Sequence, residues 1–223
     1  IFDVREVEAR IRLLRSLLPE DTGLCFAVKA NPFLIPYVAD LVDRLEVCSP
    51  GEYEICIQEQ IAPEKIVVSG VNKTYESMKR ILSYSKGAGI YTIESEEHAK
   101  ILRTLAEKNQ MPLSALIRLS SGNQFGVDAE TFLRLAKEIQ ESPYLTLAGV
   151  HYYAGTQKRQ SKLEKELDTL TAFAKTFEEE TGTVLNELEY GAGMKVSYFI
   201  NDSEKEDRKS TRLNSSHSKI SYA

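Results

Sequence analysis

Short apolar runs alternate with helical patterns along most of the chain. Strands are predicted where β-branched and other apolar residues run together, over Leu24–Val28, Leu45–Cys48, Lys65–Val68, Ile90–Ile93, Ser114–Leu119, Thr146–Val150 and Glu187–Tyr190. Helices are predicted where apolar residues recur at three- and four-residue spacing, over Asp3–Leu17, Pro36–Arg44, Pro50–Gln60, Tyr75–Tyr84, Glu96–Asn109, Ala129–Glu141 and Lys158–Thr181. This alternation is typical of an α/β protein whose parallel sheet is covered by helices.

Polar residues gather directly after the predicted strands. They are Lys29 and Asn31, Ser49 and Glu52, Ser69 and Asn72, Glu94, Arg118 and Ser120, Tyr153 and Thr156, and Gly191 and Gly193. Parallel strands bring such groups to one face, where β/α barrels and open α/β sheets both place their sites. An open sheet would concentrate them at one switch point, so their spread over every predicted strand favours a closed barrel.

Composition excludes several classes of function. The 223 residues are 42% hydrophobic, contain no apolar run long enough for a bilayer, and carry a formal charge of -5 without a basic stripe. We therefore expect no membrane and no nucleic-acid partner. Cys25, Cys48 and Cys56 read as reduced thiols of a cytoplasmic protein, and no metal-ligand spacing is present. Because the chain opens at Ile1 without a leader, we expect an internal fragment.

Several polar residues have structural explanations. Ser49 and Glu52 form the pattern of a capping box around Pro50, and Thr74, Ser95 and Asp128 stand where helices should begin. His98 and His217 are expected to face solvent. His151 alone shares a strand end with candidate site residues; a satisfied core histidine is the first interpretation, and an acid or base is the alternative.

Lys29 and two small-residue turns are the strongest candidates for chemistry. Lys29 ends an apolar strand, where loss of hydration should lower its pKa and free the amine to condense with an aldehyde. The Gly191–Ala192–Gly193 turn lets backbone amides approach a phosphate, and Gly155 and Thr156 follow the neighbouring strand. An amine beside a phosphate cradle suits an aldehyde cofactor that carries a phosphate.

The chain resembles the barrel domain of the fold-type III pyridoxal-phosphate-dependent decarboxylases, the group of diaminopimelate, ornithine and arginine decarboxylases. The similar segments, in order, are FAVKANP (26–32), EVCSPGE (46–52), GVNKT (70–74), LIRLSSGNQFG (116–126), GVHYYAGTQ (149–157) and LEYGAGM (188–194). The resemblance implies a TIM-like barrel of the alanine racemase/decarboxylase type, incomplete, with about seven of eight strands and without the family's second β-domain.

The resemblance also implies the roles of individual residues. Lys29 would bind the aldehyde of pyridoxal 5'-phosphate and be the catalytic residue. Gly191, Ala192, Gly193 and Thr156 would hold the phosphate, and Glu46 and Arg118 would line the edge of the ring. Tyr153 stands where the family usually has a ring-stacking histidine; its aromatic face can still stack, and His151 lies on the same side of the strand.

The last 22 residues depart from the family pattern. Residues 1–201 are predicted to be the truncated cofactor-binding barrel, and residues 202–223 a polar, disordered and non-native tail unable to form a barrel strand. The family's acidic partner of the pyridine nitrogen is missing, so this fragment is expected to be inactive by itself.

The implied activity is decarboxylation of a small amino acid, with diaminopimelate as the first candidate and a homodimer as the full-length assembly. An alanine-racemase-like enzyme is one alternative, although racemases usually follow their lysine with a tyrosine–glycine pair and Asn31–Pro32 follows Lys29 here. A non-catalytic relative that binds the cofactor or a partner protein is the other alternative, and Tyr153 is the feature that favours it.

Overall fold

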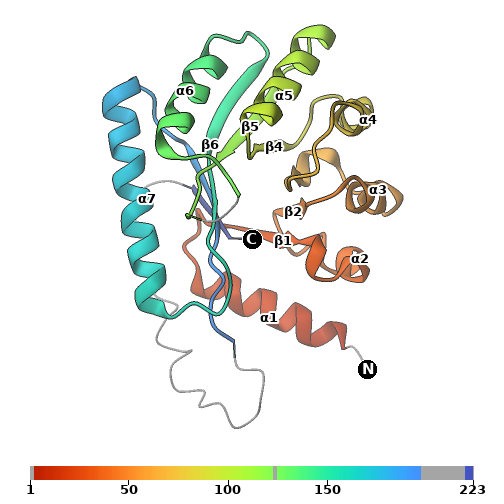
Figure 1. Cartoon of the computed structure of the whole chain (residues 1–223). Helices are drawn as coiled ribbons and strands as arrows, with labels where there is room; N and C mark the ends of the chain where they lie inside the picture. Colours follow the sequence, from red (N-terminus) through yellow and green to blue (C-terminus); the bar gives the residue numbers. More distant parts are fainter. Residues whose placement is uncertain (1–2, 123–124, 197–218, 223) are drawn as a thin grey trace.

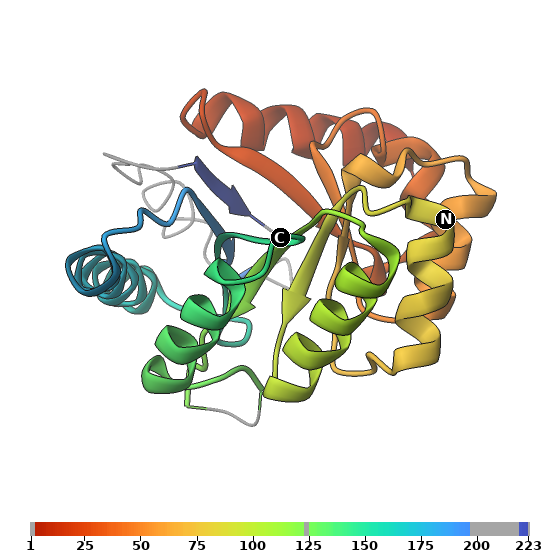
Figure 2. The ribbon, with the colours of Figure 1, turned by 90° about the horizontal axis from the view of Figure 1, so that it is seen from above.

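Eight parallel strands follow one another in sequence order around a closed barrel, and helices lie on its outside (Figures 1 and 2). The computed structural model describes residues 3–122, 125–196 and 219–222, the last segment by its backbone alone. The strands are β1 Gly23–Ala27, β2 Arg44–Val47, β3 Ile66–Val68, β4 Ile90–Ile93, β5 Leu113–Arg118, β6 Leu145–Tyr153, β7 Glu187–Gly191 and β8 Lys219–Tyr222. The α-helices are α1 Val4–Leu17, α2 Ile35–Val38, α3 Pro50–Gln58, α4 Tyr75–Ser85, α5 Glu96–Asn109, α6 Ala129–Gln140 and α7 Gln160–Thr181. The β/α barrel predicted from the sequence is confirmed.

Alternate residues of the strands enter two separate apolar clusters. Ile66 and Val68 on β3 belong to the large cluster that the helices complete, whereas Val67 between them packs with Ile90 and Leu116. Side chains of a strand alternate between its faces, so the first cluster lies between sheet and helices and the second lies inside the barrel.

Helix starts are fixed by the caps that the sequence predicts. The Thr74 hydroxyl accepts a hydrogen bond from Ser77 N at 3.2 Å, and the Asp128 carboxylate accepts one from Thr131 N at 2.8 Å. Before α3, the Ser49 hydroxyl accepts from Glu52 N, and the Glu52 carboxylate accepts from Cys48 N at 2.7 Å. Glu52 is thus a capping residue, although the amide it reaches belongs to Cys48 and not to Ser49. Among the described helices, none is both long and apolar enough to cross a bilayer.

The predicted helix over Pro36–Arg44 is mostly absent. Two 3-10 turns, Val28–Ala30 and Pro32–Leu34, precede α2, which ends at Val38, and Arg44 already begins β2. Asp43 already belongs to the connection with β1: its backbone N–H donates to Leu24 O at 2.9 Å, and its carboxylate accepts from Leu24 N at 2.6 Å.

The tail differs most from expectation. Backbone residues Lys219–Tyr222 form β8, which pairs in parallel with both β7 and β1 and so closes the barrel. Residues 202–218, the larger part of the predicted tail, lie outside the described residues. The low apolar content of the whole segment hid the polar–apolar alternation of its last residues, which suits a short strand filling the gap between two open edges.

Candidate functional site

The carboxyl ends of the strands bring the predicted site residues together at one mouth of the barrel. The Lys29 Nζ lies 5.3 Å from the centre of the Tyr153 ring, and the Arg118 guanidinium lies 6.0 Å from the same ring. The Tyr153 ring packs against Gly191 so closely that a Cβ there would lie 2.5 Å from the ring. Lys29, in the 3-10 turn after β1, therefore meets residues at the ends of β5, β6 and β7 around one aromatic face.

The pKa of Lys29 is raised, which reverses the direction expected from the sequence. Burial is the largest single influence and lowers the pKa of the amine, but Glu46, Cys48 and Tyr153 raise it and together outweigh burial. The error had a definite cause: the sequence shows the apolar neighbours of Lys29 along the chain, but not the carboxylate that the next strand places beside it. Ala27 and Glu46 are direct neighbours in the register of β1 and β2.

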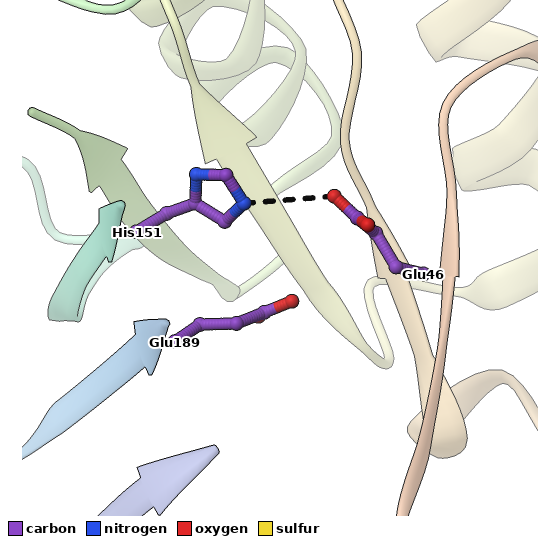
Figure 3. Close-up of side chains that lie close together, drawn as sticks. All are labelled: Glu46, His151 and Glu189. Carbon is purple, nitrogen blue, oxygen red and sulfur yellow. Dashed lines mark ion pairs between the residues drawn. The ribbon is translucent and has the colours of Figure 1, made fainter. Parts of the chain in front are cut away.

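Glu46, His151 and Glu189 form a buried cluster beneath the mouth. Their side chains come from β2, β6 and β7 and point toward one another (Figure 3), with ligand atoms within 4.8 Å of each other. His151 Nε2 lies 3.5 Å from the Glu46 carboxylate. Although burial opposes it, the contact with His151 lowers the pKa of Glu46 to about 2. Burial is the main cause that raises the pKa of Glu189 to about 7.

Arg118 is held by a second buried network. Its guanidinium donates to the Glu94 carboxylate at 3.0 Å, and the Lys73 Nζ lies 3.5 Å from the other Glu94 oxygen. Lys73 also donates to the Thr92 hydroxyl at 3.1 Å. Burial lowers the pKa of Lys73 to about 8, because the nearby carboxylate offsets only part of the lost hydration. This network fixes the position of a cation at the mouth.

A pocket of about 420 Å³ opens beside this network and is lined by Val71, Glu94, Ser95, His98 and Phe125. His98 is buried, not solvent-facing as the sequence suggested: its Nδ1 accepts from Glu94 N at 3.3 Å, and its Nε2 lies 3.2 Å from the carbonyl oxygen of Val71. The charged neighbours of His98 along the helix concealed that its own face turns inward. His217 lies outside the described residues.

The two glycine turns touch each other, as expected for a shared anion cradle. A Cβ on Gly193, whose φ is +58°, would lie 1.9 Å from the carbonyl oxygen of Gly155. The Gly193 carbonyl accepts from Lys158 N at 2.9 Å, which ties the turns together. Ala192 is buried and Thr156 is exposed at the rim. Because the two backbone segments lie so close together, only backbone amides, and not side chains, have room to bind a ligand here.

The donor set fits pyridoxal 5'-phosphate. The mouth contains the amine of Lys29, the aromatic ring of Tyr153 and the backbone cradle at Gly193, which a Cβ would fill. The Arg118 guanidinium, held by Glu94, lies beside the same ring. The structure places the residues that the sequence proposes for cofactor binding in or beside this mouth; they are Lys29, Glu46, Arg118, Tyr153, Thr156, Gly191, Ala192 and Gly193.

Three site residues were missed by the sequence reasoning: Lys73, Thr92 and Glu189. Glu189 stood within a predicted strand, and its spacing of two from Glu187 and from Gly191 could have shown that it faces the barrel interior. Lys73 lies in the GVNKT segment (70–74), which resembles the family, but only the folded structure shows its contact with Glu94. Thr92 carried no signal beyond being a polar residue in an apolar strand.

Comparison with known proteins agrees with this geometry. The family model described as "Pyridoxal-dependent decarboxylase, pyridoxal binding domain" matches residues 4–221. The diaminopimelate decarboxylase of Actinosynnema pretiosum subsp. auranticum is 29% identical to this chain over an alignment of 223 positions, gaps included. The alignment covers 92% of this chain and 49% of that protein. The chain thus spans about half the length of this curated relative.

Two crystal structures share the fold. A variant of the Helicobacter pylori diaminopimelate decarboxylase, complexed with L-lysine, has a TM-score of 0.81 at 19% identity over 99% of this chain and 61% of that chain. The Vibrio vulnificus lysine/ornithine decarboxylase, complexed with putrescine, has a TM-score of 0.81 at 17% identity, with the same coverage of both chains. From the motifs, the geometry of the mouth and the match over residues 4–221, the chain belongs to the pyridoxal-binding domain family of the pyridoxal-dependent decarboxylases.

Proposed function

We propose that the whole protein catalyses pyridoxal-phosphate-dependent decarboxylation of an amino acid, and that this chain supplies the cofactor-binding barrel. The observation that carries the proposal is the meeting of Lys29, the Tyr153 ring and the touching glycine turns at one barrel mouth. When bound, the cofactor supplies an electron sink for the charge left when carbon dioxide departs. Every other task falls to side chains and backbone of the protein.

Lys29 would bind the cofactor's aldehyde covalently, and Tyr153 would stack on the ring. Amides of Gly191, Ala192 and Gly193, with the Thr156 hydroxyl at the rim, would hold the phosphate. Arg118 is held by Glu94 at the ring's edge, so its charge is available there without a change of rotamer.

Glu46 sets the protonation state of Lys29. It is ionised at neutral pH and favours the ammonium form of the lysine. Covalent binding of an aldehyde requires the neutral amine. We therefore expect the rate of covalent cofactor binding to rise with pH, and Glu46→Gln to make the amine available at lower pH.

The substrate, assembly and location follow as parts of the same proposal. We take a diamino acid such as diaminopimelate as the first substrate to test, because the first curated relative is named for it. A homodimer in the cytoplasm is the proposed setting of the full-length protein. This chain alone is proposed to be inactive, because a second domain would have to complete the site.

A non-catalytic relative is the second candidate, and one observation favours it: Tyr153, which carries no imidazole, is the aromatic ring beside Lys29. Such a protein would bind the cofactor and release no carbon dioxide, so two separate readouts distinguish the candidates.

The test uses the full-length protein, wild type and Lys29→Ala, with Lys100→Ala as a control because Lys100 is an exposed lysine of α5. After incubation with pyridoxal 5'-phosphate and borohydride, peptide mass analysis should find the cofactor on Lys29 in wild type and Lys100→Ala only. Carbon dioxide release from a panel of diamino acids should follow the same pattern. Trapping on another lysine refutes the assignment, and trapping without carbon dioxide release supports the non-catalytic candidate.

A further inference from the structure

Glu189 is a buried titratable residue to which the proposed chemistry assigns no role. Its side chain is fully buried, and neither of its carboxylate oxygens has a hydrogen-bond partner at ordinary distance and angle; the thiol of Cys25, a weak donor, is the side chain that interacts with it most directly. Figure 3 shows it directed toward His151 and Glu46. The Nδ1 of His151 is also buried without a partner. Unpaired buried polar atoms are rare in native proteins and call for an explanation.

Glu189 has no free cation among the described residues around it. The groups that act on it are Cys25 on β1, Arg44 and Glu46 on β2, His151 on β6 and Glu187 on β7; on β8, Ser221 is its neighbour in register. Arg44 is engaged through two nitrogens by Glu187, and His151 by Glu46. Among the other cations near the mouth, Lys73 and Arg118 are held by Glu94, and Lys29 interacts with Glu46.

Ionising both carboxylates in this buried site would cost electrostatic free energy. Glu46 and Glu189 have oxygens within 4.8 Å of each other, both side chains are buried, and Glu46 already has His151 and Lys29 as partners. When like charges meet in a buried site, one of the two acids keeps its proton. Glu189, which has no charged partner of its own, is the acid that keeps it.

We propose that Glu189 keeps its proton below neutral pH, and that in this form it acts as a positioning residue by leaving Glu46 the one ionised carboxylate of the cluster, facing Lys29. The proposal rests on the proposed function only for the role of Lys29. A neutral Glu189 needs no cation beside it, so its burial without an ion-pair partner costs less free energy than burial of the ionised form. When Glu189 ionises, the added negative charge favours the ammonium form of Lys29 and makes the amine less available.

A bound divalent cation is the competing explanation, because a histidine and two carboxylates are common metal ligands. The charges of the mouth argue against it: with Glu189 neutral, the carboxylates of Glu46, Glu94 and Glu187 are all matched by cations of the protein. A metal-bound histidine also normally donates its second ring nitrogen to a partner, and His151 Nδ1 has none.

The test is made on the purified chain without cofactor. Infrared spectra should show the C=O band of a buried carboxylic acid at about pH 6 that disappears with a midpoint near 7. The band should be missing in Glu189→Gln and kept in Glu130→Gln, which removes an exposed acid of α6 and leaves the Arg44–Glu187 pair intact. A wild-type protein with no such band, or a variant Glu189→Gln that retains it, overturns the proposal. The wild-type titration decides the question even if a variant does not fold.

Acetylation of Lys29 as a function of pH tests the positioning role. Glu189→Gln should match wild type at about pH 6 and react about threefold faster at about pH 9, because it lacks the added charge. The control Glu130→Gln should follow wild type. Equal rates for Glu189→Gln and wild type at alkaline pH overturn the role. Stoichiometric zinc or manganese in wild type that is lost in Glu189→Gln also overturns it, in favour of a cation site. Neither measurement uses pyridoxal 5'-phosphate, so both remain informative if the borohydride experiment fails.

Discussion

At the scale of single residues, the barrel interior holds two acids whose pKa values are shifted in opposite directions. Glu46 is an anion beside His151 and Lys29 whose pKa lies at about 2, and Glu189 is an acid without an ion-pair partner whose pKa lies at about 7. A lowered pKa contributes stability above the unfolded value, which is lost as the pH falls; a raised pKa gives stability at low pH, which is lost as the pH rises. The folded state should therefore be weakened at both ends of the pH range, by different residues.

Glu189→Gln should remove the alkaline half of this dependence. Because the folded pKa of Glu189 lies above its ordinary value of 4.5, wild type should lose on the order of 2 kcal/mol of unfolding free energy between about pH 5 and pH 8. The variant has no proton to lose and should be the more stable protein at pH 8. Urea denaturation at the two pH values measures the difference. Parallel losses in wild type and variant would contradict the assignment.

The sequence indicates several of the site residues, but it does not show which side chains lie beside them. Lys29, Arg118 and Tyr153 were predictable because each stands at a strand end within a recognisable segment. The raised pKa of Lys29 and the burial of His98 were not predictable, since both depend on neighbours supplied by another strand or loop. Glu189 was missed for the same reason: its isolation is a property of three strands together.

At the scale of elements, the turns after β6 and β7 are coupled by backbone contact and not by side chains. Gly193 adopts a positive φ and faces the Gly155 carbonyl, so a Cβ at this position meets both strain and a clash. The prediction of strands succeeded because apolar runs bounded by glycine are strong local signals. The helix over Pro36–Arg44 was mispredicted because the contact of Asp43 with Leu24 and the pairing of Arg44 with Cys25 depend on the fold and not on the local sequence.

Gly193→Ala should cost about 3 kcal/mol of stability and weaken phosphate binding, whereas Gly182→Ala should cost about 1 kcal/mol and leave binding intact. Gly182 has a similar φ of +68° with nothing within 4 Å of its Cβ position, so it isolates the backbone cost from the clash. Thermal unfolding gives the stabilities, and calorimetric titration with pyridoxal 5'-phosphate gives the binding. Equal costs at the two glycines would show that the contact with Gly155 is unimportant.

At the scale of the whole molecule, closure of the barrel depends on its last strand. β8 is the neighbour of both β7 and β1, with Leu188 opposite Ile220 and Gly23 opposite Ser221. Without it, two strands would present unpaired backbone groups along their edges, which favours association between chains. The composition of the tail argued for a foreign segment, and the pairing of its last residues argues that they complete the barrel.

Ser221→Pro compared with Ser221→Ala tests that closure at one backbone position. Proline removes the N–H that a ladder between two strands uses and fixes φ, whereas alanine keeps the donor, so the pair separates the backbone from the side chain. We expect Ser221→Pro to lower the midpoint of thermal unfolding by several degrees, roughly what a loss of 1–2 kcal/mol gives for a chain of this size, and to increase association seen by light scattering. Ser221→Ala should behave as wild type on both measurements. If the proline variant also matches wild type, the strand contributes nothing to closure, and the barrel's stability resides in the seven strands that the sequence predicts.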